Sequence, residues 1–325
     1  MGSPLDVITM GRIGVDIYPL QVGVALPQVE SFGKYLGGTA TNVAVASARL
    51  GLRSAVISRT GADPFGQFVH DALRGFGVDD RWVTPVERYP TPVTFCELFP
   101  PDDFPLYFYR EPKAPDLDIA ADDLDMTAIA EAGIFWMTGT GLAEEPSRSA
   151  TLAALRHRAK RGTTVFDLDW RPMFWPDHEQ ARHWYREALA HVTVAVGNLD
   201  ECERAVGTRD PEAAAEALLE LGVQLAVVKQ GPGGVLARTR EQRTVAPPVP
   251  VEVVNGLGAG DAFGGALCHG LRHGWDLART VRFANAAGAL VAGRLACSSA
   301  MPTAEEVAEF LPSTDRAAPS PSTAD

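Results

Sequence analysis

Short apolar runs alternate with longer stretches of helical periodicity along most of the chain. Runs rich in Val, Ile and Phe, which are typical of strands, lie at 6–11, 54–61, 133–139, 163–169, 192–198 and 225–231. Between such runs, stretches such as 39–51 and 63–77 repeat apolar residues at helical spacing. The alternation predicts βαβ units and a mostly parallel sheet. Since the later strand runs are apolar throughout, we expect helices on both faces and a doubly wound α/β fold.

Two segments, 14–36 and 90–112, interrupt this rhythm with aromatic and proline-rich sequence that lacks helical periodicity. Two interpretations are open from the sequence. The segments form either edge excursions of the main sheet or a small β-structured lid over a site. We expect one α/β domain over 1–312, and a disordered tail over 313–325, which is rich in Pro, Ser and Ala.

The balance of charge limits the expected partners. The chain has 29 Lys and Arg against 41 Asp and Glu, a formal net charge of −12, and its basic residues form no long run. Nucleic acids and anionic membranes bind basic surfaces, so we expect neither as a partner. No apolar stretch reaches the roughly 18 residues of a membrane span, and the first residues do not resemble a secretory signal, so a cytoplasmic location is expected. Four widely spaced cysteines are expected to be buried and reduced.

A glycine-rich turn, NGLGAGDAFGGAL at 255–267, joins a strand-like run to a helix-like run. It is not a dinucleotide fingerprint, because Asp261 takes the place of the third glycine, and the chain has no G-x-x-x-x-G-K-[ST] P-loop. The unpaired N–H groups of a helix that begins near Ala259 favour an anion such as phosphate. Asp261 is then placed to accept a proton from a substrate hydroxyl. Alternatively, Asp261 caps the helix and the glycines only allow close packing.

The turn at 255–267 resembles the C-terminal signature of the PfkB carbohydrate kinase family, and KYLGGTATNVAVASARLG at 34–51 resembles its N-terminal signature. The resemblance extends from about residue 6 to 311, with the motifs in the family's order. It implies the ribokinase-like fold and ATP-dependent phosphorylation of a sugar, with Mg²⁺ arriving together with ATP. A sugar-binding sensor without turnover is the alternative of another class, and the intact Asp261 counts against it.

The resemblance also implies roles for individual residues. Asp261 matches the catalytic base, and the matches to the anion hole are Gly258, Ala259 and Gly260. The matches to sugar contacts are Asp16, Gly38 and Asn42. Glu201 matches a residue that helps to organise Mg²⁺ and phosphate indirectly, and the matches to the nucleotide site are Asn198, Lys229, Gly231, Gly234 and Asn285.

Several of these residues also have a simpler structural explanation. Asp16 could lie in a turn after the first strand, and Asn42 could cap the helix that begins near it. Asn198 and Glu201 have the spacing of a capping box. Lys229 could be the solvated end of a strand.

One position departs from the family pattern. Many members begin the second signature with Asp, whereas this chain has Asn255. In the family that position often helps to build a monovalent-cation site beside the anion hole. The departure puts a requirement for K⁺ in doubt.

Within the family, the segment at 91–119 resembles kinases of 5-dehydro-2-deoxy-D-gluconate, an acid sugar of inositol breakdown. The motifs YFYR and DLDWR also resemble 2-keto-3-deoxygluconate kinases, and a fructokinase-like hexose kinase is a third alternative. Arg110 and Arg171 could each offer a planar fork to a carboxylate or phosphate, with Tyr109 covering the sugar. Alternatively, Arg110 is an exposed charge of the lid, and Arg171 pairs with Asp167 or Asp169.

The expected partners are therefore ATP and a small acid sugar. Related folds often pair through their lids, and the aromatic residues of 14–36 and 90–112 are compatible with a homodimer formed in this way. Aromatic side chains of a lid also cover substrates, so the pattern leaves the oligomeric state open.

Overall fold

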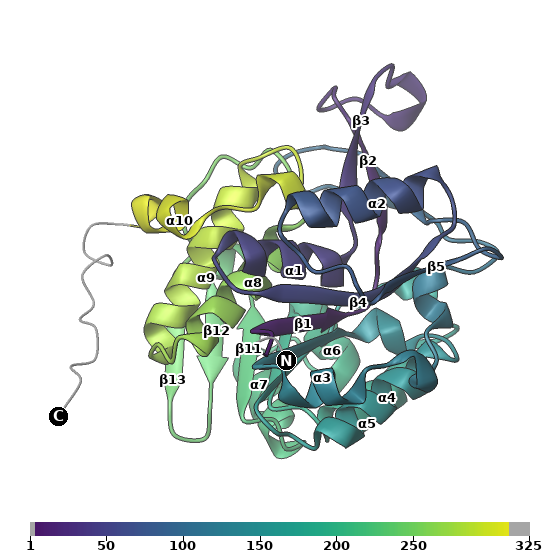
Figure 1. The fold of residues 1–325 in the computed structure, drawn as a ribbon. Coiled ribbons are helices and arrows are strands. Elements are labelled where there is room, and N and C mark those ends of the chain that lie inside the picture. Colours follow the sequence, from purple (N-terminus) through teal and green to yellow (C-terminus); the bar gives the residue numbers. More distant parts are fainter. Residues whose placement is uncertain (1–3, 312–325) are drawn as a thin grey trace.

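The structure is a computed structural model, and it describes residues 4–311. The segment expected to be disordered, 313–325, lies outside the described residues. A nine-stranded sheet forms the centre of the molecule, in the order β13-β12-β11-β10-β9-β8-β1-β4-β5 (Figure 1). Its strands are β1 (Val7–Met10), β4 (Ser54–Gly61), β5 (Val83–Val86), β8 (Ile134–Thr138), β9 (Thr163–Asp167), β10 (Val194–Asn198), β11 (Leu225–Lys229), β12 (Val235–Arg238) and β13 (Arg243–Ala246).

The direction of the strands confirms the doubly wound, mostly parallel α/β fold. All strands from β5 through β1 to β11 run parallel, and β12 and β13 add antiparallel strands at one edge. The chain builds outward from β1 to β4 and β5 and then returns to β8 on the other side of β1. The strand order therefore reverses at β1, and ligands of such sheets bind at the carboxyl ends of the strands.

Helices cover both faces of the sheet (Figure 1). Inner strands such as β8, β10 and β11 are buried on both sides, which explains why their sequences are almost entirely apolar. One face is covered by α1 (Thr39–Arg49), α2 (Pro64–Gly75), α8 (Ala259–Arg272), α9 (Leu277–Ala292) and α10 (Ala304–Phe310). The other is covered by α3 (Met126–Glu131), α4 (Ser147–Arg158), α5 (His178–Leu189), α6 (Leu199–Val206) and α7 (Pro211–Glu220).

Two glycines bring α8 close to its neighbours. A Cβ atom at Gly265 would lie 2.3 Å from the Cβ of Ala46 on α1, and one at Gly264 would lie 2.8 Å from the ring of Trp136 on β8. Larger residues would push α8 away from a close-packed interior. Because α1 and α8 touch, Asn42 and Asp261 in their first turns can meet.

The two segments that interrupt the rhythm form a separate sheet rather than edges of the main one. Its order is β3-β2-β6-β7, from β2 (Gly14–Pro19), β3 (Phe32–Gly37), β6 (Val93–Cys96) and β7 (Leu106–Tyr109). We call this four-stranded sheet the lid sheet. Side chains of β2, β6 and β7 line a pocket together with the start of α8, so the lid sheet lies over that helix end.

Two further expectations concern the chain as a whole. Among residues 4–311, no helix is both long and apolar enough to cross a membrane. The four cysteines are free and buried, as predicted: Cys96, Cys202, Cys268 and Cys297.

Candidate active site

The first turn of α8 is an open helix end. Its N-cap residue is Gly258, which makes no side-chain cap, and Ala259, Gly260 and Asp261 follow as the first helical residues. The N–H groups of such a turn have no partner within the helix and carry its positive dipole end. Asp261 is therefore not the capping residue, and the turn keeps the anion-binding character that the sequence predicted.

Gly258 can only be glycine in this turn. Its φ of 82° lies in the left-handed region, which side-chain-bearing residues rarely adopt. A Cβ atom here would lie 2.7 Å from the Sγ of Cys297, so the turn is also pressed against the segment after α9. Both constraints fix the position of the helix end.

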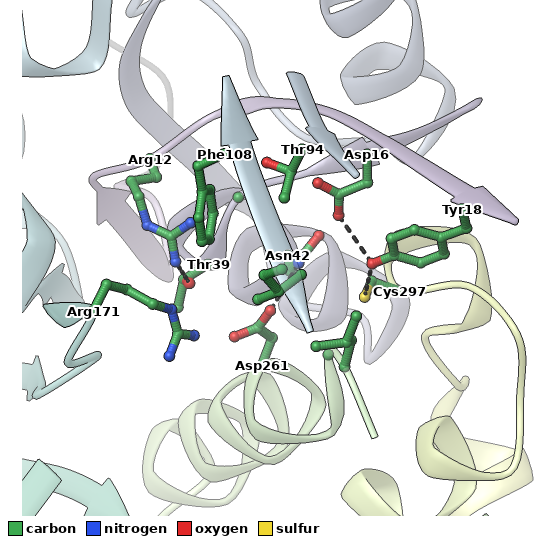
Figure 2. A pocket seen from close by; sticks show the side chains of 14 residues that line it. Arg12, Asp16, Tyr18, Thr39, Asn42, Thr94, Phe108, Arg171, Asp261 and Cys297 are labelled. Atoms are coloured by element: carbon green, nitrogen blue, oxygen red, sulfur yellow. Dashed lines mark hydrogen bonds between the residues drawn. The ribbon is translucent and has the colours of Figure 1, made fainter. Parts of the chain in front are cut away.

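Two pockets meet at this turn. A cavity of about 60 Å³, which we call the lid pocket, lies under the lid sheet and is lined by Gly258 and Asp261 (Figure 2). A larger cavity of about 460 Å³, which we call the strand-end pocket, is lined by Ala259 and Gly260. The first turn of α8 thus contributes residues to both, with the carboxyl group of Asp261 on the lid side.

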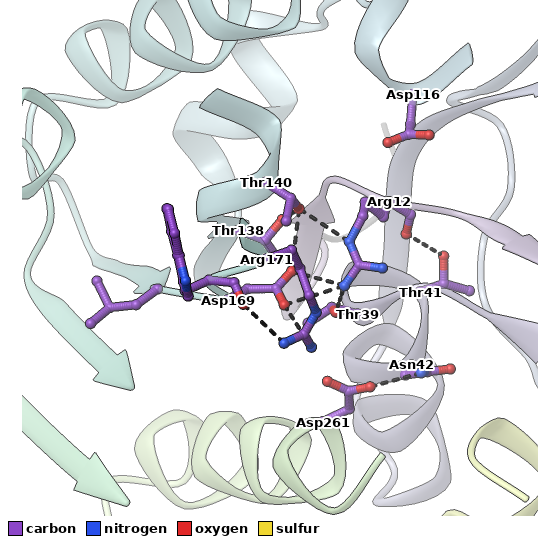
Figure 3. Close-up of polar contacts among 12 residues, drawn as sticks. Arg12, Thr39, Thr41, Asn42, Asp116, Thr138, Thr140, Asp169, Arg171 and Asp261 are labelled. Carbon is purple, nitrogen blue, oxygen red and sulfur yellow. Dashed lines mark hydrogen bonds and ion pairs between the residues drawn. The ribbon is translucent and has the colours of Figure 1, made fainter. Parts of the chain in front are cut away.

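Asp261 is held by the first turn of α1. The Nδ2 of Asn42 donates a hydrogen bond of 2.7 Å to its Oδ2 (Figure 3). The Oδ1 of Asn42 in turn accepts a hydrogen bond of 2.6 Å from the hydroxyl of Ser298. Burial raises the pKa of Asp261 to about 7, although the Asn42 bond and nearby arginines act in the opposite direction. A carboxyl with this pKa can both accept and return a proton near neutral pH.

The residues predicted to contact a sugar come together in the lid pocket. Asp16, Gly38 and Asn42 all line it. The Tyr18 hydroxyl donates a 3.0 Å bond to the Oδ2 of Asp16, while burial raises the pKa of that carboxyl to about 6. Gly38 has a φ of 102°, and a Cβ atom there would lie 2.3 Å from the carbonyl oxygen of Arg12. The glycine therefore lets β3 turn sharply into α1.

Most residues predicted to contact the nucleotide line the strand-end pocket. These are Lys229, Gly231, Gly234 and Asn285. A Cβ atom at Gly260 would lie 3.3 Å from the Nζ of Lys229, so this ammonium reaches the first turn of α8. Burial lowers the pKa of Lys229, but the carboxylates of Glu201, Asp167 and Asp261 raise it by more, and the lysine stays charged.

Asn198 and Glu201 form the capping box that their spacing suggested. The N–H of Asn198 donates a 2.6 Å bond to Glu201 Oε2, and the N–H of Glu201 donates a 2.9 Å bond to Asn198 Oδ1. Both residues lie at the carboxyl end of β10, beside Lys229 at the end of β11. Neither lines the strand-end pocket directly, so any part in nucleotide binding is indirect.

Tyr109 and Arg110, which the sequence singled out, lie away from the lid pocket, as does the nearby Lys113. Tyr109 is 66% exposed and packs edge-on against Phe95, because alternate residues of β7 face opposite sides of the sheet. Phe108, its neighbour, lines the pocket in its place. Arg110 Nη2 pairs with Asp116 at 2.7 Å, and Lys113 pairs with Glu144 at 2.7 Å. The guanidinium of Arg110, which was expected to bind a carboxylate of the substrate, thus binds the carboxylate of Asp116 instead.

Arg171 does line the lid pocket, and it is joined there by Arg12, which the sequence analysis did not single out. The Nη2 atoms of both arginines pair with Asp169, each at 3.0 Å (Figure 3). The signal available in the sequence was an arginine directly after the first apolar strand, four residues before Asp16.

Comparisons with known proteins agree with this geometry. The pfkB family of carbohydrate kinases matches residues 5–304. A 5-dehydro-2-deoxygluconokinase of Geobacillus thermodenitrificans is 31% identical over 316 residues, which cover 95% of this chain and 94% of the relative. An Escherichia coli protein described as a ribokinase II, in complex with ATP and Mg²⁺, has a TM-score of 0.86 at 26% identity, covering 95% of this chain and 99% of that one. A Vibrio cholerae fructokinase double mutant, solved with fructose, ADP and potassium, has a TM-score of 0.82 at 26% identity, covering 96% and 100%.

An open helix end between two pockets, on a doubly wound sheet with a lid, is the arrangement of a sugar phosphotransferase. The chain belongs to the pfkB family of carbohydrate kinases. The predicted family and the predicted ribokinase-like fold are both confirmed.

Proposed function

We propose that this kinase uses ATP to phosphorylate the C6 hydroxyl of 5-dehydro-2-deoxy-D-gluconate. The curated relatives that carry the name 5-dehydro-2-deoxygluconokinase support this substrate, and they match nearly the whole chain. The two arginines of the lid pocket support an anionic sugar, since planar guanidinium groups suit carboxylates. The substrate would be one of the acid sugars that take part in inositol breakdown.

The observation that carries the proposal is the position of Asp261, in a turn that both pockets share. ATP in the strand-end pocket would place its terminal phosphate at the N–H groups of this turn, which stabilise the charge that develops during transfer. The sugar in the lid pocket would present its hydroxyl to Asp261, which accepts the proton as the phosphoryl group moves in line. Lys229 lies beside the same turn and adds positive charge.

The residues at the strand ends fit a magnesium ion that arrives with ATP. Oxygen ligands suit Mg²⁺, and the carboxylates of Glu201 and Asp167 lie near Lys229 at this edge of the sheet. The ion would neutralise phosphate charge. Because one oxygen of Glu201 already accepts a hydrogen bond from the N–H of Asn198, the predicted indirect role of Glu201 in organising Mg²⁺ and phosphate is favoured over direct binding of the ion.

The lid sheet would open and close during turnover. The lid pocket of about 60 Å³ has room for only a few water molecules, so a six-carbon acid requires the lid to move outward on entry. Closure would then exclude water and limit wasteful hydrolysis of ATP. A homodimer formed through the lid sheet stays a prediction, and it is supported by the exposed aromatic side chains of Phe32, Tyr107 and Tyr109.

The proposed substrate is tested by a panel of sugars in a coupled assay of ADP release. The panel contains 5-dehydro-2-deoxy-D-gluconate, 2-keto-3-deoxy-D-gluconate and D-fructose. The highest kcat/KM is expected for the first acid. If kcat/KM is higher for 2-keto-3-deoxy-D-gluconate, the substrate is that acid sugar instead. If kcat/KM is highest for D-fructose, the proposal of an acid sugar is refuted. Sugar binding without ADP release would point to the sensor.

We also propose that turnover does not require K⁺. The buried Asn255 donates a 2.7 Å bond from Nδ2 to the carbonyl oxygen of Leu295 and accepts a 2.9 Å bond from the N–H of Leu257. An aspartate has no N–H to donate, so it would need a cation to hold that carbonyl.

The expected result is that kcat/KM stays unchanged when tetramethylammonium replaces K⁺ in the assay. The matched variant Asn255→Asp should lose activity in the same buffer and regain part of it when K⁺ is added. A clear loss of wild-type activity without K⁺ would refute the proposal.

A further inference from the structure

The guanidinium of Arg12 uses two of its nitrogen atoms, Nε and Nη2, in hydrogen bonds to other residues of the protein. Arg12 lies two residues after the end of β1 and is only 6% exposed. Its Nε donates to Thr140 at 3.2 Å, and its Nη2 donates to Thr39 and to both oxygens of Asp169. Among the residues that the structure describes, no recorded bond uses Nη1. The guanidinium lines the lid pocket, so this nitrogen can serve a ligand there.

Aromatic rings fix the plane of this guanidinium. The Cζ of Arg12 lies 5.7 Å from the ring centre of Phe108 on the lid sheet and 5.8 Å from that of Phe174. Rings at these distances attract the cation and restrict its rotation. A donor that is already oriented loses little entropy when it binds a planar carboxylate.

The charges of the lid pocket are divided between two ends. Arg12 and Arg171 both pair with Asp169, so two guanidinium groups share one directly paired carboxylate at their end of the pocket. Burial alone would raise the pKa of Asp169, but the two arginines lower it, so its carboxylate stays ionised. Asp16 and Tyr18 lie at the opposite end (Figure 2). An acid sugar would therefore bind with its carboxylate towards the arginines.

Arg110 cannot take this role in the observed arrangement. Its Nη2 donates to both oxygens of Asp116, at 3.0 and 2.7 Å, and its side chain does not line the lid pocket. It is also an arginine stacked near Phe174, at 5.0 Å from the ring centre, so it offers a matched control for Arg12.

We propose that Arg12 binds the carboxylate of the sugar and thereby sets the preference of this kinase for acid over neutral sugars. The inference rests on the proposed function, since it needs an acid substrate. It adds a specificity-determining residue, from the loop between β1 and β2, to the lid-pocket residues already described.

The test compares Arg12→Gln with Arg110→Gln in steady-state assays with 5-dehydro-2-deoxy-D-gluconate and with D-fructose. Removing one partner of a buried charge pair in an interface typically costs enough binding energy for a loss of about 10²-fold to 10³-fold. For Arg12→Gln, we expect KM for the acid to rise by that factor with kcat little changed, because a contact remote from the reacting hydroxyl binds ground and transition states alike. Values for D-fructose, and all values for Arg110→Gln, should stay near those of the wild type.

A second variant separates recognition from folding. Arg12→Lys keeps a positive charge beside Asp169 but lacks the planar fork, and we expect a smaller rise in KM for the acid. Measurements of thermal unfolding and of ATP binding identify any variant that has not folded. If Arg12→Gln does not fold, the KM of Arg12→Lys is compared with that of the wild type instead. An unchanged KM for the acid in a folded variant, or a fall in kcat alone, would overturn the role of Arg12. If the wild type itself preferred D-fructose, the proposed function would fail instead.

Discussion

Replacing Asp261 with asparagine is expected to lower kcat by about 10²-fold to 10⁴-fold, the usual contribution of a positioned general base. Asparagine has nearly the same shape and can keep a hydrogen bond with Asn42, so the first turns of α1 and α8 should stay in place. The strand-end pocket is lined by other residues, and ATP should bind to Asp261→Asn as it does to the wild type. Stopped assays of ADP release and calorimetric titration with ATP measure the two quantities.

The same substitution changes the dependence of activity on pH. With a pKa of about 7, the carboxyl of wild-type Asp261 is increasingly protonated as the pH falls below that value, and a protonated carboxyl cannot accept the hydroxyl proton. The kcat/KM of the wild type should therefore fall towards acid pH. The residual activity of Asp261→Asn should lack the part of this fall that begins near pH 7, and should fall only at the lower pH at which Asp16, with a pKa of about 6, is protonated. Near-normal turnover of the variant, or an unchanged acid limb, would remove Asp261 as the base.

Replacing Gly258 with alanine is the second change with a large expected effect. The added methyl group would have to sit 2.7 Å from the Sγ of Cys297, on a backbone with a φ of 82°. The turn must shift to relieve both, which moves the N–H groups that hold the phosphate. Losing one such donor typically costs about 10²-fold in kcat, and we expect at least that loss.

Gly274 provides the control for this substitution. It follows the other end of α8, also has a positive φ, at 64°, and has open space where a Cβ would be. Gly274→Ala should show a similar backbone strain in thermal unfolding but retain turnover. Equal losses of kcat in the two variants would mean that strain, and not the displaced anion hole, limits Gly258→Ala.

The fold could be predicted because its determinants are local. Strands covered on both faces must be apolar throughout, and that pattern is visible in each run from 6–11 to 225–231. The glycine-rich turn at 255–267 was equally informative, since an anion site needs both close backbone approach and an adjacent acid. The sequence did not decide whether 14–36 and 90–112 extend the main sheet, because strand pairing between distant segments leaves no local mark.

Predictions from the sequence failed for residues whose positions depend on strand register and on contacts between distant parts of the chain. One residue of register separates Phe108, which faces the lid pocket, from Tyr109, which faces away. Arg110 was expected to bind substrate, but the turn after β7 brings Asp116 onto it. Arg12 gave little signal, because a single arginine after a strand is common and its partner Asp169 is far along the chain.

The most direct test of the account is a crystal structure with a non-hydrolysable ATP analogue, Mg²⁺ and the acid sugar bound together. We expect the terminal phosphorus at the N–H groups of Ala259 and Gly260, and the acceptor hydroxyl within about 2.6–3.2 Å of an Asp261 oxygen. A terminal phosphate bound elsewhere, or a sugar whose hydroxyl cannot reach Asp261, would contradict the assignment of the α8 turn as the centre of phosphoryl transfer.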